Sequence, residues 1–486
     1  MRLLKRIPNL WFYSIVVLFA IFEGILLVYS LETGRNKTRN IVVLLPFIVL
    51  MFSLLQRIRI ATLIGFLLLI FWIPAGFDNW MLYTFEILLY VITLIVMLIS
   101  TRSNALQQNN ALTNIPWFGF LLFAVGAIIT WLLSTKTGNE LNEIRTTSLI
   151  PMALSIVFFL TIRSIKDGEH YLIIILTSAG ILGLLFLVGK NFSGLITLSE
   201  YATESGRLSM SLIIPFVGSM TMLPQSTSNW FGYLLIFSFS VWILHPSRGY
   251  RIFGLLLCLL YGAVIISTSG RGGLITAVLG AAVISVYTGF SRSGYRVKGV
   301  WLKLGLVCFA VLGGFWYLST SSSNLSFYQH GISLFKDPLN DPTLLYRFRM
   351  WSNGWNLYME NPFFGVGLSG IATPWGPDTS EILNYFFYIL LSYGLMGFIG
   401  LILILVKLSI SYLQGTRADN RIVRMMSVAG IGGFLGFLLG MQPEEPYSIT
   451  LVYAPLLVAF AVSRLYKGNL LLDPTQVDIQ SKYSED

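Results

Sequence analysis

The sequence has few charged residues and few cysteines, and each shortage argues against a class of protein or of site. Charged residues make up only 11% of the 486 residues, whereas soluble domains carry about a quarter. The chain is therefore too apolar for a soluble globular protein. Its two cysteines, Cys258 and Cys308, lie inside apolar runs, so we expect neither a structural disulfide nor a zinc site.

Motifs for nucleotides and metals are missing as well. The sequence contains no phosphate-binding glycine loop, dinucleotide fingerprint, metal-ligand spacing or Ser/His/Asp set. We therefore predict a protein that uses no cofactor and no catalytic metal, and ATP-driven transport is disfavoured. The net charge of +10 is scattered over short segments and forms no single basic face, which argues against a nucleic-acid partner.

Long apolar runs dominate what is present. A membrane-spanning helix needs about 20 mostly apolar residues. The sequence predicts an all-α, polytopic membrane protein with about 14 such helices. The predicted spans lie near residues 9–30, 40–55, 60–77, 80–100, 116–134, 147–163, 170–189, 229–245, 251–268, 272–289, 300–319, 395–413, 423–441 and 449–465.

The basic residues predict the orientation, because short cytoplasmic loops are rich in Lys and Arg. Segment 209–224 is short and broken by proline and glycine, and we expect that it does not cross. Nearly all basic short loops then share one side, and both termini are cytoplasmic. The exception is the first outer loop, with Arg35, Lys37 and Arg39.

This orientation gives the outer face a polar loop of about 60 residues, 320–381, which we expect to be partly helical. The apolar run after it, 383–413, is too long for an upright span. We expect its first part to lie over the outer mouth and to bend into the membrane near Gly394, Gly397 or Gly400.

Five short motifs follow one another in and around this loop. They are Ser228-Asn229 with Gly232, Ser269-Gly-Arg271-Gly272, Arg347 four residues before Trp351, Asn361-Pro362 with Gly365 and Gly367, and Asn384 ten residues before Gly394-Leu395 and Gly397.

In order, spacing and predicted outer-face position, these motifs resemble the bacterial O-antigen ligase and O-antigen polymerase family over roughly residues 205–400. We accordingly divide the chain into N-terminal spans (1–200), a ligase/polymerase-like region (201–465, with the outer loop 320–381) and a cytoplasmic tail (466–486). Leu383 stands where the family often has a histidine. That departure argues mildly against the ligase subgroup.

The resemblance implies a glycosyltransferase of the bacterial plasma membrane. Its donor would be a glycan linked to undecaprenyl pyrophosphate, and it would act within the bilayer alongside a flippase and a chain-length regulator. Polymerisation of repeat units is the preferred reaction. The alternatives are a ligase that moves the finished glycan to a lipid acceptor, and a flippase or transporter that makes no bond.

Three arginines are candidates for binding the pyrophosphate: Arg271, Arg347 and Arg207. Arginine binds phosphate oxygens bidentately and stays charged in a site of low dielectric constant. In a helix, positions two apart point in different directions, so Arg349 is expected at the surface rather than beside Arg347. The competing interpretation is that these arginines contact lipid headgroups or water.

An acceptor hydroxyl benefits from a base within hydrogen-bond reach. Glu381, Asp378 and His330 are the candidates, and Glu381 would lie three residues from Asn384 on one helical face. The adjacent pair Glu444 and Glu445 is a rival, which loop solubility explains equally well. Asn384 and Trp351 are the candidates for binding the acceptor sugar, although interfacial tryptophan is common in membrane proteins.

Overall fold

The structure of the protein is a computed structural model, which describes about half of the chain. The described residues are 116–133, 158, 162, 164–189, 196–197, 210–214, 218–222, 224–268, 271–289, 299–306, 309, 313, 342–367, 384–440 and 449–467.

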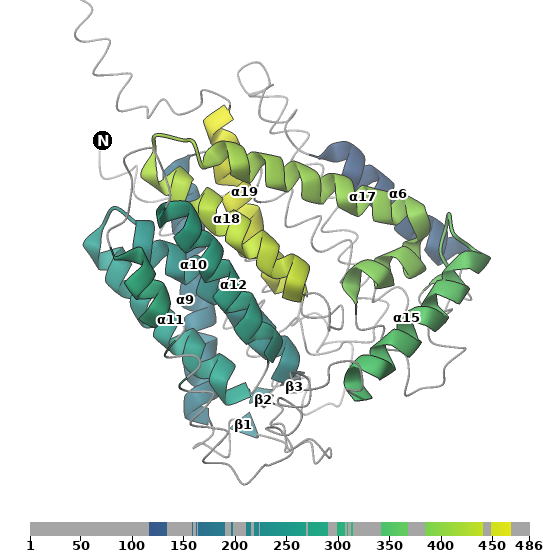
Figure 1. Cartoon of the computed structure of the whole chain (residues 1–486), viewed down its shortest axis with the longest axis horizontal. Coiled ribbons are helices and arrows are strands. Elements are labelled where there is room, and N and C mark those ends of the chain that lie inside the picture. The colour runs from purple at the N-terminus through teal and green to yellow at the C-terminus, as the bar shows by residue number, and fades with distance from the viewer. Residues whose placement is uncertain are drawn as a thin grey trace, which may run out of the picture.

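Six helices pack side by side as a bundle (Figure 1). They are α9 (Ile165–Gly189), α10 (Pro224–Leu244), α11 (Arg248–Thr268), α12 (Arg271–Gly289), α18 (Arg421–Gly440) and α19 (Ile449–Lys467). The central member is α10, which packs against α11, α12 and α18.

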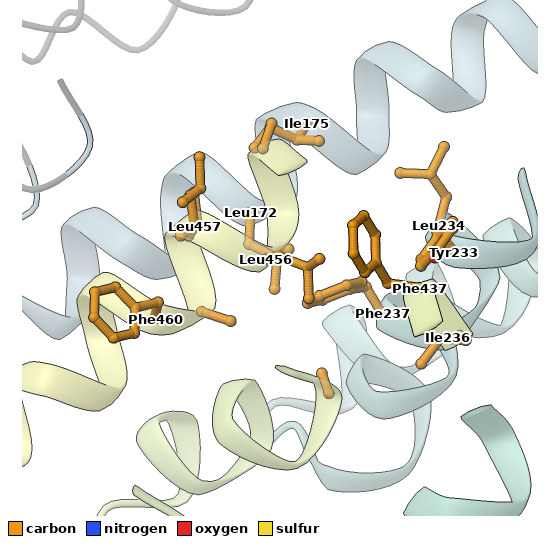
Figure 2. Close-up of a cluster of buried hydrophobic side chains, with 14 of the residues drawn as sticks. Leu172, Ile175, Tyr233, Leu234, Ile236, Phe237, Phe437, Leu456, Leu457 and Phe460 are labelled. Carbon is orange, nitrogen blue, oxygen red and sulfur yellow. The ribbon is translucent and has the colours of Figure 1, made fainter. Parts of the chain in front are cut away.

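The core of the bundle is aromatic and aliphatic (Figure 2). Phe237 of α10, Phe437 of α18 and Phe460 of α19 are fully buried. Leu172 and Ile175 of α9 close the cluster from another side. Without a hydrophobic drive between helices in lipid, this dense packing is what holds the spans together.

Residues 196–222 add a short antiparallel sheet, which the sequence analysis did not predict. Its strands are β1 (Ile196–Thr197), β2 (Met210–Ile214) and β3 (Gly218–Met222), in the order β1-β2-β3. Strands of five residues are too short to cross a bilayer, which takes about 9–11. The prediction that 209–224 is not a membrane-spanning helix is therefore confirmed, and α10 begins with Pro224.

Three further helices lie beside the bundle: α6 (Trp117–Leu133), α15 (Pro342–Glu360) and α17 (Tyr385–Gly415). The helix α17 is broken at Gly394, where φ is 63° and ψ is −167°. The bend expected at one of three glycines is thus confirmed, and it falls at the first of them. The outer-loop segment predicted to be partly helical contains α15.

Glycine lets α6 and α17 approach backbone to backbone after the bend. A Cβ added to Gly126 would lie 2.9 Å from the Gly397 nitrogen, and one added to Gly119 would lie 3.0 Å from the Gly400 oxygen. Small residues at such crossings are typical of helix pairs in membranes.

Five described helices are long and apolar enough to cross a membrane. Their candidate spans are Thr227–Leu244, Arg248–Ser267, Gly272–Gly289, Tyr385–Gly415 and Arg421–Leu438, and shorter apolar helices cover Phe118–Thr130 and Ala454–Leu465. The protein is a multi-pass membrane protein. The predicted spans 9–30, 40–55, 60–77 and 80–100 lie outside the described residues, so the total of about 14 stays a prediction.

Basic residues gather at one end of the bundle. Lys166, Arg248, Arg417 and Arg421 are all exposed where α9, α11 and α18 begin and α17 ends. A buried His245 links α10 to Glu169 of α9 at this end, with 3.1 Å between Nε2 and Oε1. The N-terminus of α12, with Arg271, and the three-stranded sheet lie at the opposite end (Figure 1). This segregation agrees with the predicted orientation.

Candidate functional site

The first turns of α10 and α12 meet in direct backbone contact. A Cβ on Gly273 would overlap the Ser228 carbonyl, and a Cβ on Gly272 would overlap the Asn229 side chain. Gly232 approaches Gly273 equally closely. Two of the five sequence motifs, separated by some forty residues, therefore form one junction.

Arg271 is the first residue of α12 and stands at the edge of this junction. The packing against α10 explains why Gly272 and Gly273 are glycines. The first turn of a helix presents unpaired backbone N–H groups and a positive dipole end, which suits an anion. Position 271 can therefore offer cationic and N–H donors together.

Phe437 of α18 connects the junction to the start of α17. Its ring centroid lies 6.4 Å from that of Tyr233 in α10 and 6.1 Å from that of Tyr385, the first residue of α17. One residue earlier, Gly436 faces Thr276 of α12, and a Cβ there would lie 2.9 Å from the threonine methyl carbon. The N-terminal parts of α10, α12 and α17 thus surround the C-terminal half of α18.

Asn384 is the N-cap of α17. Its Oδ1 accepts a hydrogen bond from the Phe387 backbone N–H at 3.1 Å, and its backbone is extended, with φ −156° and ψ 107°. An N-cap of this kind satisfies one of the free donors of the first turn. The helix begins only after Asn384, and the expected role of Glu381, which lies outside the described residues, stays a prediction.

The helix α15 rests on the first part of α17. A Cβ on Gly354 would lie 2.7 Å from Cε1 of Phe387 and 3.1 Å from Cδ1 of Leu391. Positions 347 and 351 precede Gly354 by seven and three residues, so both fall on the α17-facing side of the helix. Arg349 is exposed on another side, as the sequence predicted.

Trp351 keeps a free donor on this side. Its ring stacks edge-to-face with Phe348 at 5.7 Å, and its indole Nε1 is buried with no hydrogen-bond partner among the described residues. A buried indole N–H usually finds an acceptor. Trp351 therefore has the capacity to donate to a bound hydroxyl or phosphate oxygen.

The segment Asn361–Gly367 clasps the bend in α17 through the backbone. The Val366 N–H donates to the Leu391 carbonyl at 2.9 Å, and the Leu395 N–H donates back to the Pro362 carbonyl at 2.9 Å. Both groups would lose their helical partners at the break. The glycines of this motif are therefore structural, and they tie the C-terminal end of α15 to the bend.

The remaining predicted site residues lie outside the described residues. These are Glu381, Asp378, His330 and Arg207, together with Glu444 and Glu445. Their roles stay predictions, and so does independence from metal. Packing contacts link these elements in turn, from α12 to α18, from α18 to α17 and from α17 to α15, and the roles of Arg271, Arg347, Trp351 and Asn384 stay predictions.

Sequence reasoning missed the contribution of α6. Its Thr130 lies with Oγ1 3.0 Å from the Phe364 carbonyl and 2.8 Å from its own helical Gly126 carbonyl. The spacing of Gly119 and Gly126, seven residues apart on one face, was the available signal. It did not indicate the partner, which lies more than two hundred residues further along the chain.

A model of the O-antigen ligase family matches residues 256–402. Residues 256–402 are therefore similar to the O-antigen ligase family. The match runs from α11 through α12 and α15 into α17, and it includes Arg271, Arg347, Trp351 and Asn384. It covers less than a third of the chain. A comparison with curated proteins finds no match.

The O-antigen ligase family confirms the resemblance drawn from the five motifs, of which four lie inside the matched region. The family points to a glycosyltransferase-like ligase or polymerase that uses lipid-linked glycans in a membrane. Asn229 precedes the matched segment, yet it contacts Gly272 inside it. The helix α10 therefore packs directly against the segment that the family model matches, although it lies outside that segment in the sequence.

Proposed function

We propose that the protein is a membrane glycosyltransferase that polymerises undecaprenyl-pyrophosphate-linked oligosaccharide repeat units at the outer face of the plasma membrane. The observation that carries the proposal is Arg271 as the first residue of α12 in the O-antigen ligase region. The glycines that follow it are explained by packing against α10. A leaving pyrophosphate needs a cation at such a point.

The reaction requires one bond to form and one to break. An acceptor hydroxyl attacks the anomeric carbon of the donor sugar, the carbon–oxygen bond to pyrophosphate breaks, and the electron pair leaves with the pyrophosphate. Arg271 and Arg347, with Arg207 as a third candidate, stabilise the negative charge that develops there. The hydroxyl proton passes to a base, for which Glu381, Asp378 and His330 are the candidates.

The α17-facing side of α15 supports Arg347, rather than Arg349, as the arginine that binds the pyrophosphate. Position 347 shares a helix side with Trp351 and Gly354, and that side packs against α17. Arg349 is exposed. Trp351 contributes an indole face for a sugar ring and an N–H that has no partner among the described residues. Asn384, whose Oδ1 caps α17, is the candidate for binding the acceptor sugar.

The runner-up is a ligase that transfers the finished glycan to a lipid acceptor, which is the reaction in the family's description. Leu383 stands where many members have a histidine, and this favours the polymerase. A flippase or transporter is the third candidate. It accounts less well for Arg271 at the first residue of an apolar helix, because transporters bind substrates near the midplane.

The test is a reconstituted reaction with the full chain in vesicles and undecaprenyl-pyrophosphate-linked repeat units from the host, with products resolved on a gel. Polymerisation gives a ladder that Arg271→Ala and Arg347→Ala abolish and Arg349→Ala preserves. Removal of one such electrostatic contact costs roughly 10²–10³-fold in rate. The Arg349→Ala variant is the matched control, since it removes the same charge from the same helix.

Three other outcomes have different meanings. A single transfer that requires an added lipid acceptor identifies a ligase. Lipid movement across the vesicle bilayer without any new bond contradicts the glycosyltransferase proposal. Equal loss in Arg347→Ala and Arg349→Ala, with both proteins folded, contradicts the assignment of Arg347 as the phosphate-binding arginine of α15.

A further inference from the structure

One side of α15 is exposed along its whole length and is mostly apolar, with the small polar Ser352 in its middle. Leu345, Phe348, Trp355 and Met359 are exposed by 41%, 47%, 50% and 61%. Their spacing of three, seven and four residues keeps them on one stripe of the helix. The stripe begins in the first turn and ends in the last, so the exposure is a property of the helix and not of one frayed end.

The other sides of α15 differ from this stripe. Met350, Gly354 and Tyr358 are buried on the side toward α17. Between the buried side and the apolar stripe lies an exposed polar flank, with Arg349, Asn353, Asn356 and Glu360. Around its circumference, the helix therefore contacts protein on one side and presents an apolar side and a polar side to its surroundings.

The bend in α17 fixes the depth of α15 relative to the membrane. From Leu395 to Gly415 the helix rises about 31 Å at 1.5 Å per residue, close to the thickness of the hydrocarbon core. The Gly415 end is followed by the exposed Arg417 and Arg421, so it lies at one membrane boundary. Gly394 therefore lies at the opposite boundary.

The backbone hydrogen bonds of segment Asn361–Gly367 hold the end of α15 at the same depth in the membrane as Gly394. Val366 and Pro362 are hydrogen-bonded to residues on both sides of Gly394, and only Asn361 separates Pro362 from the end of α15 at Glu360. Phe363 and Phe364, in the clasp itself, are exposed by 66% and 41%. In Figure 1, α15 also runs at a steep angle to α10, α12 and α18. A helix in this position lies along the boundary and does not cross it.

We propose that α15 lies in the plane of the membrane interface, with Leu345, Phe348, Trp355 and Met359 inserted among the acyl chains of the adjacent leaflet. The polar flank then faces headgroups and water. The partner is the lipid surface itself, which an amphipathic helix binds through the area that its apolar side chains bury. Tryptophan on the apolar face agrees with an interfacial depth.

The placement has a consequence that rests on the proposed function. A helix held at the interface keeps position 347, on its α17-facing side, at the level of lipid phosphates. The pyrophosphate of a lipid-linked donor lies at that same level, so the donor reaches Arg347 without leaving the bilayer. The α15 helix is thus held between α17 on one side and the lipid of the membrane interface on another.

The experiment measures depth and does not depend on activity. In a full-length chain with Cys258→Ala and Cys308→Ala, single spin labels are attached at Phe348→Cys and Met359→Cys on the apolar stripe. Asn353→Cys and Asn356→Cys on the polar flank are the matched controls, and Leu259→Cys, exposed by 57% on the spanning helix α11, is the lipid reference. The protein is studied in vesicles of phosphatidylethanolamine and phosphatidylglycerol.

Collision rates with oxygen, which concentrates in lipid, are compared with those of a water-soluble nickel chelate. We expect the oxygen-to-nickel ratio at 348 and 359 to exceed that at 353 and 356 several-fold and to approach that of the α11 reference. Ratios equal to those of the polar flank would mean that the stripe faces water. Low collision rates with both reagents would mean that protein covers it, from a second copy or from this chain. Either result overturns the proposal, whatever the glycosyltransferase assay gives.

Discussion

Gly365 and Gly394 lie back to back, each with a positive φ, 75° and 63° respectively. A Cβ on Gly365 would come within 2.7 Å of the Gly394 nitrogen, and a Cβ on Gly394 would overlap the Phe363 carbonyl. Two short motifs, almost thirty residues apart, are thus halves of one backbone contact. The contact holds the bend of α17 and the end of α15 in a fixed relation.

The first prediction concerns this contact. Gly394→Ala adds a methyl group where there is no space, to a backbone conformation that is essentially confined to glycine. We expect a loss of more than about 3 kcal/mol in stability, from backbone strain of about 1–3 kcal/mol and from the overlap with the Phe363 carbonyl. Thermal unfolding in detergent measures it.

Gly299→Ala is the matched control for Gly394→Ala. Gly299 also has a positive φ, 74°, but an added Cβ meets nothing within 4 Å. We expect Gly299→Ala to lose only about 1–2 kcal/mol in stability, from its backbone conformation alone. Equal destabilisation of the two variants would show that the contact between the motifs contributes nothing.

The second prediction separates two roles of Asn384. As an N-cap it needs only a side-chain oxygen, so Asn384→Asp retains the bond to the Phe387 N–H, whereas Asn384→Ala loses about 1 kcal/mol. If the amide N–H groups also bind the acceptor sugar, Asn384→Asp keeps its melting temperature but loses glycosyl transfer. Full activity in a folded Asn384→Asp would confine the residue to capping.

The sequence predicts those parts of this arrangement that depend on residues close together in the chain, and it does not predict the contacts between distant segments. The bend in α17 followed from its length and from the three glycines in it. The choice of Gly394 did not, because Gly397 and Gly400 serve the approach of α6. That approach is a pairing of distant segments, and a single sequence carries no record of it. Glycine for conformation and glycine for packing look alike in the chain.

The site shows the same division. The spacing of Arg347 and Trp351 is local, so their common helix side was predictable, and so was the separate direction of Arg349. The start of α17 was also readable, since an Asn before an apolar run is a typical helix start. Glu381 precedes this start and lies outside the described residues, so its role stays a prediction. The meeting of Asn229 with Gly272 needed the fold, because it depends on how α10 and α12 pack.

The third prediction concerns the hydroxyl that joins α6 to the clasp. Thr130→Val keeps the shape but removes the donor that lies 3.0 Å from the Phe364 carbonyl. We expect a loss of about 1 kcal/mol in stability. Thr177→Val in α9 is the control, since Thr177 Oγ1 donates only to the Ile173 carbonyl of its own helix at 2.7 Å. Equal effects would mean that the bond to Phe364 is not formed.

The fourth prediction concerns the opposite end of the bundle. The Ser247 backbone N–H donates to Nδ1 of His245 at 3.1 Å, so the ring proton resides on Nε2 and is donated to Glu169. Glu169→Gln keeps an acceptor oxygen and is expected to be mild. Glu169→Leu leaves the buried Nε2–H without that acceptor, at a cost of about 2 kcal/mol. Lys166→Leu, exposed on the same helix, is the control. If the Gln and Leu variants unfold at the same temperature, the hydrogen bond between Glu169 and His245 does not stabilise the packing of α9. Other contacts of α9, such as the hydrogen bond that the Tyr261 hydroxyl of α11 donates to the Leu176 carbonyl, would then hold it in place.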